Sequence, residues 1–262
     1  MSSRSCLFCD GSVAGVERAR EHVVPDWLRL HLDATNEIVY QATAATNDRS
    51  IQQEREHALS AFVEGQVCRL CNNGWMSVLE NEAKPILIPL MAGESPLGLN
   101  DSDRQVLARW TAKTAYMCAS ASLFDRTSVP SEHLSALSGN DNWATGVGVF
   151  ACVLTPYMAF AYAEHNQWPV FSRIIKPEPE GRYKIALQFK ALGLLVAHWP
   201  EPNAMFVLEA GVHVPVWPPK RIHPAYFAGR SVPQPSATPL SSEATVQLER
   251  FSNTLGIILQ SL

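Results

Sequence analysis

The chain has 262 residues, of which 47% are hydrophobic and 18% carry charge. This composition excludes a disordered chain and predicts two folded domains. The net charge of −4 gives no sign of a protein that binds nucleic acid through its overall charge.

Two cysteine pairs are the strongest local signal in the sequence. Cys6-Leu7-Phe8-Cys9 lies near the N-terminus and Cys68-Arg69-Leu70-Cys71 lies further along. The residues before the first pair lack the apolar segment of a secretion signal, so we expect a cytoplasmic protein. In a reducing compartment, two such pairs predict one structural zinc ion held by four thiolates, those of Cys6, Cys9, Cys68 and Cys71.

Between the pairs, Glu21-His22-Val23-Val24 precedes Pro25, which favours an extended backbone before it. A short helix is expected to begin at Asp26 and to cover residues 26–32. Residues 38–40 have the composition of a strand, and we expect the polar stretch 43–56 to be a surface excursion.

After the second pair, residues 75–84 have the apolar spacing of a helix, which Pro85 and Pro89 are expected to limit. The segment from 90 to 100 contains Gly93, Pro96 and Gly98. We take it as the domain boundary, so that residues 1–95 form one domain and residues 96–262 form a second.

The second domain is expected to open with a long helix whose capping box is Ser102 and Gln105. Seven prolines predict an extended connection over 215–240, and an apolar spacing of four and three predicts a helix over 242–262. Packing of that helix on its own domain is favoured over a homodimer contact. Strand-like segments lie between these features, at residues 146–154, 157–163, 182–189, 193–199 and 204–210.

Residues 145–163 carry no charged side chain, a length close to the ~20 residues that cross a bilayer. Glycines, valines, aromatic residues and Thr155-Pro156 predict two buried strands there instead of a membrane span. The patterns together predict an α+β protein: an N-terminal zinc-stapled unit, then a mixed α+β domain with an antiparallel sheet and a C-terminal helix.

Residues 6–84 resemble the HNH, or ββα-metal, endonucleases, and in particular the branch that carries a structural zinc bound by two Cys-x-x-Cys pairs. In that family an acidic residue and a histidine stand together on the first strand of a hairpin. The second cysteine pair opens the helix, and an asparagine follows its last cysteine. Besides the four cysteines, the matching positions here are Glu21, His22 and Asn72.

The resemblance implies hydrolysis of phosphodiester bonds in nucleic acid, with DNA favoured over RNA. His22 would be the general base that activates water, because imidazole titrates near neutral pH. Glu21 and Asn72 would hold a catalytic Mg²⁺ or Mn²⁺ ion through oxygen atoms, with Asn73 as the alternative to Asn72. The zinc ion would be structural, because a closed four-thiolate shell leaves no position for substrate.

Two other functions stay open at this point. One is a zinc-stabilised module that binds nucleic acid or protein on the HNH scaffold without turnover. The other is a nuclease controlled by a regulatory ligand or partner at residues 96–262. The sequence contains no nucleotide-binding P-loop, dinucleotide glycine fingerprint or nucleophile elbow, which excludes several other enzyme classes.

Overall fold

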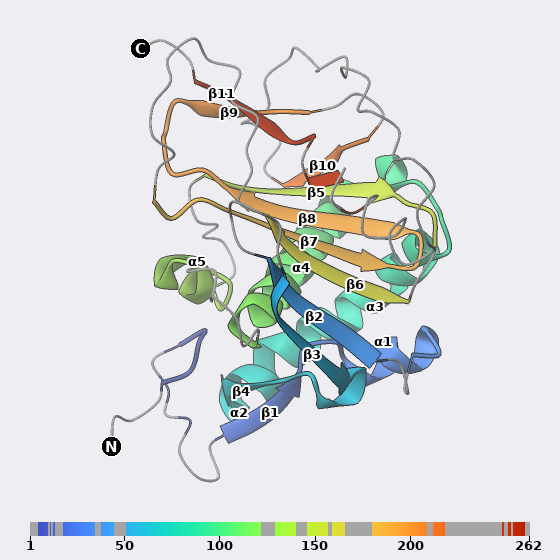
Figure 1. Ribbon diagram of the computed structural model, residues 1–262, viewed down its shortest axis with the longest axis vertical. Coiled ribbons are helices and arrows are strands. Elements are labelled where there is room, and N and C mark those ends of the chain that lie inside the picture. Colours follow the sequence, from blue (N-terminus) through green and yellow to red (C-terminus); the bar gives the residue numbers. More distant parts are fainter. Residues whose placement is uncertain are drawn as a thin grey trace. The chain divides into compact units, whose positions relative to one another are not determined.

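The computed structural model describes residues 5–9, 11, 13, 18–34, 38–44, 51–121, 129–139, 146–156, 159–165, 180–208, 212–217, 248, 251–252 and 254–259, with the backbone alone for 38–44, 51–57, 163–165 and 259. The chain divides into two compact units, whose helices and strands are drawn in Figure 1. The first comprises Met1–Val78 and Tyr116–Asn142, and the second comprises Leu79–Ala115 and Trp143–Leu262. The prediction that residues 1–95 and 96–262 are separate domains is a statement about independent folding, and it stays a prediction.

The first unit contains an antiparallel pair of strands, β1 (Arg18–His22) and β4 (Val63–Cys68). β4 runs directly into α2 (Arg69–Cys71) and then into η3 (Asn72–Met76), a π-helical turn that is interrupted at Gly74. π-Helical turns inside helices occur frequently at functional sites. The extended backbone predicted at Glu21-His22 is confirmed, and both residues belong to β1.

A hairpin and three short helices also belong to this unit. β2 (Ile38–Ala44) pairs antiparallel with β3 (Ile51–Ala58), so the predicted strand at 38–40 is confirmed and extends further. Of the predicted excursion over 43–56, residues 43–44 and 51–56 belong to these two strands, and residues 45–50 lie outside the described residues. The sequence of β3 is polar, and its pairing comes from backbone hydrogen bonds that composition does not signal. The elements are α1 (Asp26–His31), β2 (Ile38–Ala44), β3 (Ile51–Ala58), η2 (Leu59–Ala61) and α5 (Ser131–Ala136).

Two predictions about helix ends are wrong. α3 (Ser77–Met91) continues through Pro85 and Pro89, because buried side chains in its last turns offset the backbone hydrogen bonds that proline removes. α4 (Asp101–Ala121) is capped by Asn100 and not by Ser102. The Asn100 side chain accepts a hydrogen bond from the Asp103 amide at 2.9 Å and donates one to the Asp103 carboxylate at 2.8 Å. Asn and Ser cap helices about equally well, so sequence alone does not separate the two positions.

The second unit contains a five-stranded antiparallel sheet, whose strands in spatial order are β10 (Val214–Trp217), β5 (Val147–Val153), β8 (Leu192–His198), β7 (Tyr183–Phe189) and β6 (Phe160–His165). β7 and β8 are buried along their whole length, because both faces of the sheet are covered. A separate strand, β9 (Ala204–Val207), pairs with β11 (Gly256–Leu259). The predicted antiparallel sheet and strand segments are confirmed, as β5 (Val147–Val153), β6 (Phe160–His165), β7 (Tyr183–Phe189), β8 (Leu192–His198), β9 and the additional β10 (Val214–Trp217).

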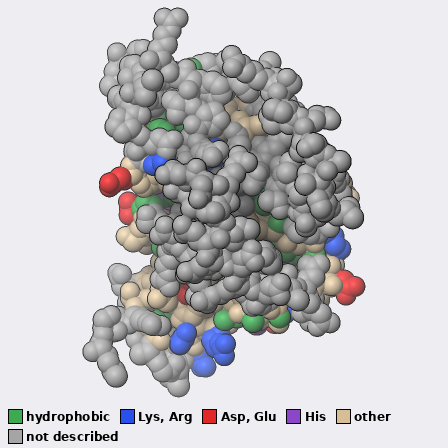
Figure 2. All heavy atoms as spheres, in the orientation of Figure 1, with side chains coloured by type: hydrophobic (Ala, Val, Ile, Leu, Met, Phe, Trp, Pro, Cys, Tyr) green, Lys and Arg blue, Asp and Glu red, His purple; other side chains and the backbone are tan. Residues whose placement is uncertain are grey.

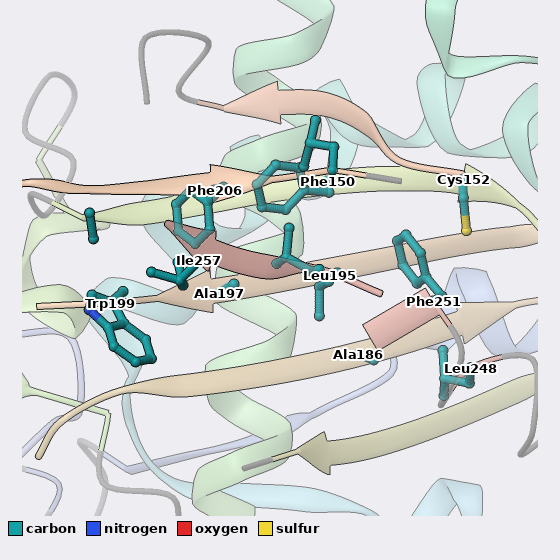
Figure 3. Packing of buried hydrophobic residues seen from close by; sticks show 13 residues of the cluster. Phe150, Cys152, Ala186, Leu195, Ala197, Trp199, Phe206, Leu248, Phe251 and Ile257 are labelled. Atoms are coloured by element: carbon teal, nitrogen blue, oxygen red, sulfur yellow. The ribbon is translucent and has the colours of Figure 1, made fainter. Parts of the chain in front are cut away.

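One face of this sheet packs on a hydrophobic cluster that includes the β9–β11 pair (Figure 3). Phe150 of β5 meets Phe206 of β9 edge to face, with ring centroids 5.3 Å apart. On another strand of the sheet, Phe189 of β7 packs on Trp110 of α4, with centroids 5.5 Å apart. Aromatic pairs of this geometry contribute beyond the area that they bury.

α3 and α4 are joined within the second unit by a buried ion pair. Lys113 is fully buried and its ammonium group contacts the carboxylate of Glu80. Breaking such a pair leaves one charge buried without compensation, so the pair fixes the two helical segments against each other.

The predicted C-terminal helix over 242–262 is wrong for its last part, since residues 256–259 form β11. Leu248, Phe251 and Ser252 are helical. Gly256 disfavours a longer helix and Ile257-Ile258 favour a strand. Lys184 anchors this turn, because its ammonium group donates to the carbonyl oxygens of Ser252 at 2.8 Å and Leu255 at 2.6 Å.

The uncharged stretch 145–163 contains β5 and the beginning of β6, which confirms the prediction of two strands. Within the described residues, helices lack the length and apolar character that crossing a bilayer requires. Of the predicted Pro-rich connection over 215–240, residues 215–217 belong to β10 and the others lie outside the described residues.

We expect Gly193→Ala to destabilise the second unit. A Cβ atom at Gly193 would lie 2.5 Å from the sulfur of Cys152 and 2.7 Å from Leu154 Cδ1, so these two side chains would have to shift. Overpacking of this kind costs about 1–3 kcal/mol in the free energy of unfolding, measured by urea denaturation. Gly98→Ala is the matched control, because a Cβ atom there meets open space. Equal unfolding free energies for the two variants would contradict the described packing.

Candidate functional site

The four cysteines of the two pairs come together in the first unit. The sulfur atoms of Cys6, Cys9, Cys68 and Cys71 all lie within 4.8 Å of one another. Cys9 and Cys68 sulfurs are 3.7 Å apart, and Cys71 and Cys9 sulfurs are 3.5 Å apart. In a tetrahedral site with zinc–sulfur bonds of ~2.3 Å, the sulfurs are separated by ~3.8 Å. The four cysteines can therefore bind a metal ion such as zinc, and the predicted metal-binding group is confirmed to this extent.

Backbone amides hold the sulfurs in place. The amide of Cys71 donates to the sulfur of Cys68, the amide of Cys68 to that of Cys6, and the amide of Gly11 to that of Cys9, each at 3.4 Å. The first knuckle is closed by a hydrogen bond from the Cys6 amide to the Gly11 carbonyl at 2.8 Å. Because these donors favour negative sulfur, they support thiolates as metal ligands.

The thiols differ in how readily they ionise. Burial raises the pKa of Cys71 and also that of Cys9. For Cys68, burial is the largest influence and acts upward, but hydrogen bonds from the Cys71 amide and the neighbouring thiols outweigh it and lower its pKa. Four clustered thiolates repel one another, so a bound cation is what allows all four to ionise together.

Phe8 and Trp75 form a small apolar core beside the four cysteines, one from each cysteine pair's segment. Phe8 lies between the first two cysteines and is completely buried. Its ring meets Trp75 of η3 edge to face, with centroids 5.3 Å apart. The core of this unit therefore includes the segment that immediately follows Cys71.

His22, the last residue of β1, is partly exposed and lies beside Asp26 at the start of α1. The Nδ1 atom of His22 is 3.2 Å from Oδ1 of Asp26, which also contacts the guanidinium group of Arg29. The hydrogen bond from Arg29 is the main reason that the pKa of Asp26 is lowered, against an opposing effect of partial burial, and the charge of His22 lowers it further. Asp26 therefore stays negative throughout the neutral range.

The sequence patterns indicate Asp26 as the start of a helix and not as a partner of His22, although it follows His22 by four residues. That spacing became a contact because Pro25 turns the chain from β1 into α1, which an isolated motif does not specify. Glu64 was also missed. It is buried, lies opposite Glu21 in the β1–β4 ladder and accepts a hydrogen bond from the Gln66 amide at 2.7 Å.

Asn72 directly follows Cys71 at the start of η3 and is half-buried. Its side-chain amide donates to Oδ1 of the exposed Asn73 at 3.3 Å. The expected convergence of Glu21, His22 and Asn72 on one catalytic metal ion stays a prediction. In the part of the chain that the structure describes, the four cysteines are the one group of three or more His, Cys, Asp or Glu side chains that could hold an ion.

Comparison with known protein families, with curated proteins and with solved structures gave no match.

We expect Cys68→Ser to lose the bound metal ion and to lower the stability of the first unit. A serine hydroxyl does not ionise at neutral pH, and structural zinc sites contribute ~10 kcal/mol or more in small domains. Metal content per chain, measured by atomic emission, and thermal unfolding are the readouts. Cys118→Ala is the matched control, because Cys118 is buried in α4 outside the cysteine cluster. Unchanged metal content in the Cys68 variant would contradict the site.

Proposed function

We propose that the chain is a metal-dependent endonuclease of the HNH type, with a structural zinc ion at the four cysteines and Mg²⁺ or Mn²⁺ as the catalytic ion. The observation that carries the proposal is the connectivity around the cysteines. The strand that bears Glu21 and His22 pairs with the strand that ends at Cys68, and Asn72 follows Cys71 in the next turn. This order of two paired strands and a helical segment is what the family resemblance implies.

In this proposal His22 is the general base and Asp26 positions it. The Nδ1–H group of His22 donates a hydrogen bond to the Asp26 carboxylate, so Nε2 carries the free lone pair that accepts a proton. This tautomer is assigned from the hydrogen-bond partner of Nδ1. Asp26 in turn is held by Arg29, which is almost fully buried. This chain of contacts fixes the orientation of a partly exposed imidazole before substrate arrives.

The reaction is hydrolysis of a phosphodiester. A water oxygen attacks phosphorus while the bond from phosphorus to the leaving oxygen breaks. His22 Nε2 accepts the proton released by that water, and the leaving oxygen takes a proton from solvent. A bound divalent cation would supply positive charge to the phosphate oxygens, on which negative charge accumulates.

Oxygen atoms of Glu21 and Asn72, or Asn73 in its place, would hold that cation. Glu21 and His22 are the last two residues of β1, so the proposed ligand and the proposed base both lie where that strand ends. The position of Glu64 opposite Glu21 supports a cation nearby, because like charges in facing positions repel each other. DNA is the proposed substrate, with RNA to be tested beside it.

We expect His22→Ala to lower the rate of DNA cleavage by about 10²–10⁴-fold in Mg²⁺ or Mn²⁺, because general-base catalysis is lost. The assay follows cleavage of plasmid DNA and labelled RNA by purified protein. His31→Ala is the matched control, since His31 is an exposed histidine at the end of α1. Equal cleavage by wild type and His22→Ala would remove His22 from the mechanism. Binding without any cleavage by wild type would contradict the nuclease proposal and favour a binding module.

We expect Asp26→Asn to lower kcat by roughly 10–100-fold with little change in KM. A carboxylate only accepts hydrogen bonds and so keeps the proton on Nδ1 of His22, whereas the amide of asparagine can also donate to Nδ1 and no longer fixes that tautomer. Asp26→Glu retains the carboxylate and is expected to recover part of the rate. Steady-state kinetics on a labelled DNA duplex give both constants. A change confined to KM would show that Asp26 serves substrate binding and not the orientation of His22.

A further inference from the structure

A hollow of 390 Å³ opens on the β1–β4 pair, and the side chains around it are basic. Its described lining consists of Arg18, Arg20, Val63 and Gly65, with no acidic side chain among them. Both arginines are exposed. Figure 2 shows Lys and Arg side chains gathered at the lower edge of the view, where Figure 1 draws β1.

The strand register places both arginines on the same face as His22. Ala19 lies opposite Val67 and Glu21 lies opposite Glu64. The interval between these two pairs is therefore three residues long in β4 and two residues long in β1. The extra residue therefore belongs to β4, and β1 alternates regularly. Arg18, Arg20 and His22 share one face of β1, while Glu21 points to the other.

Gly65 lies in the part of β4 where the register shifts, and it contacts Arg18 in this hollow. The guanidinium group of Arg18 lies across Gly65, with Nε donating to the Gly65 carbonyl oxygen at 2.9 Å. A Cβ atom at Gly65 would be 2.1 Å from Nη2 of Arg18. Because Gly65 has no side chain, it leaves room for the guanidinium group of Arg18. The Gly65 carbonyl occupies one of the five N–H donors of that group.

We propose that this hollow is a phosphate-binding subsite, which seats the nucleic-acid backbone beside the phosphodiester that His22 would hydrolyse; this assignment rests on the proposed function. Guanidinium groups match the geometry of phosphate oxygens and form the strongest hydrogen bonds to them. Arg20 is two residues from His22, or ~6.6 Å along the strand, which is comparable to the spacing of successive phosphates on one strand. The subsite recognises backbone and not base, so it supplies affinity without sequence preference.

The test measures binding of labelled DNA and RNA by fluorescence anisotropy in Mg²⁺, with every variant made in the His22→Ala background to prevent cleavage. Arg18→Ala and Arg20→Ala are each expected to weaken binding about tenfold. Each should also reduce the slope of log affinity against log salt by about one, as loss of one phosphate contact does. Lys84→Ala removes the same charge from an exposed position in α3 and is expected to leave the affinity within twofold of the parent.

Gly65→Ala tests whether the position of the Arg18 guanidinium group, and not only its charge, matters for binding. It keeps both arginines but displaces the guanidinium group, so it should weaken binding about as much as Arg18→Ala. The double variant Arg18→Ala/Gly65→Ala should bind no more weakly than Arg18→Ala alone, because both changes remove the same contact. Metal content and circular dichroism establish that each variant is folded.

The outcomes distinguish the subsite from the nuclease activity. If wild type cleaves DNA and the arginine variants bind like Lys84→Ala, the subsite is overturned and the nuclease stands. Additive losses for Arg18→Ala and Gly65→Ala overturn the placement of Arg18. If the arginine variants bind weakly but wild type never cleaves in Mg²⁺ or Mn²⁺, the subsite stands and the nuclease falls. Failure of wild type both to bind and to cleave overturns both.

Discussion

The convergence of four cysteine sulfurs is the interaction on which the first unit depends. It joins segments 62 residues apart and lies at the end of β4, where that strand enters the helix. A two-stranded sheet is marginally stable by itself in water. A metal ion held by the four cysteines would add free energy of binding to the stability of the two-stranded ladders, and burial of Phe8 against Trp75 adds a small apolar core around the same point.

The chemistry proposed for this unit follows the two faces of β1. One face carries His22 with Arg18 and Arg20, and the other carries Glu21 opposite Glu64. The bulge in β4 leaves β1 regular and places Gly65 where Arg18 needs room.

The cysteine group and the apolar strands can be predicted from sequence, whereas contacts that depend on tertiary context cannot. The cysteine group could be predicted because its spacing and ligand type are diagnostic. The strands of the second unit could be predicted because they are continuous apolar runs, as expected for a sheet covered on both faces. β3 was missed because it is polar, and α3 was predicted too short because packing overrides proline. The part of 242–262 that forms β11 was predicted as helix because β9 supplies the partner edge. Asp26 lies beside His22 because of a turn, and Glu64 lies opposite Glu21 because of a strand register, neither of which a motif encodes.

The first unit is discontinuous in sequence: its two segments are separated by Leu79–Ala115, which belongs to the second unit. α3 and α4 each contribute residues to both units. No single cut in the chain therefore releases either unit whole. Any contiguous segment that contains the whole cysteine-bearing unit also contains Leu79–Ala115 of the second unit, so an expression boundary placed after Asn142 would retain part of both units.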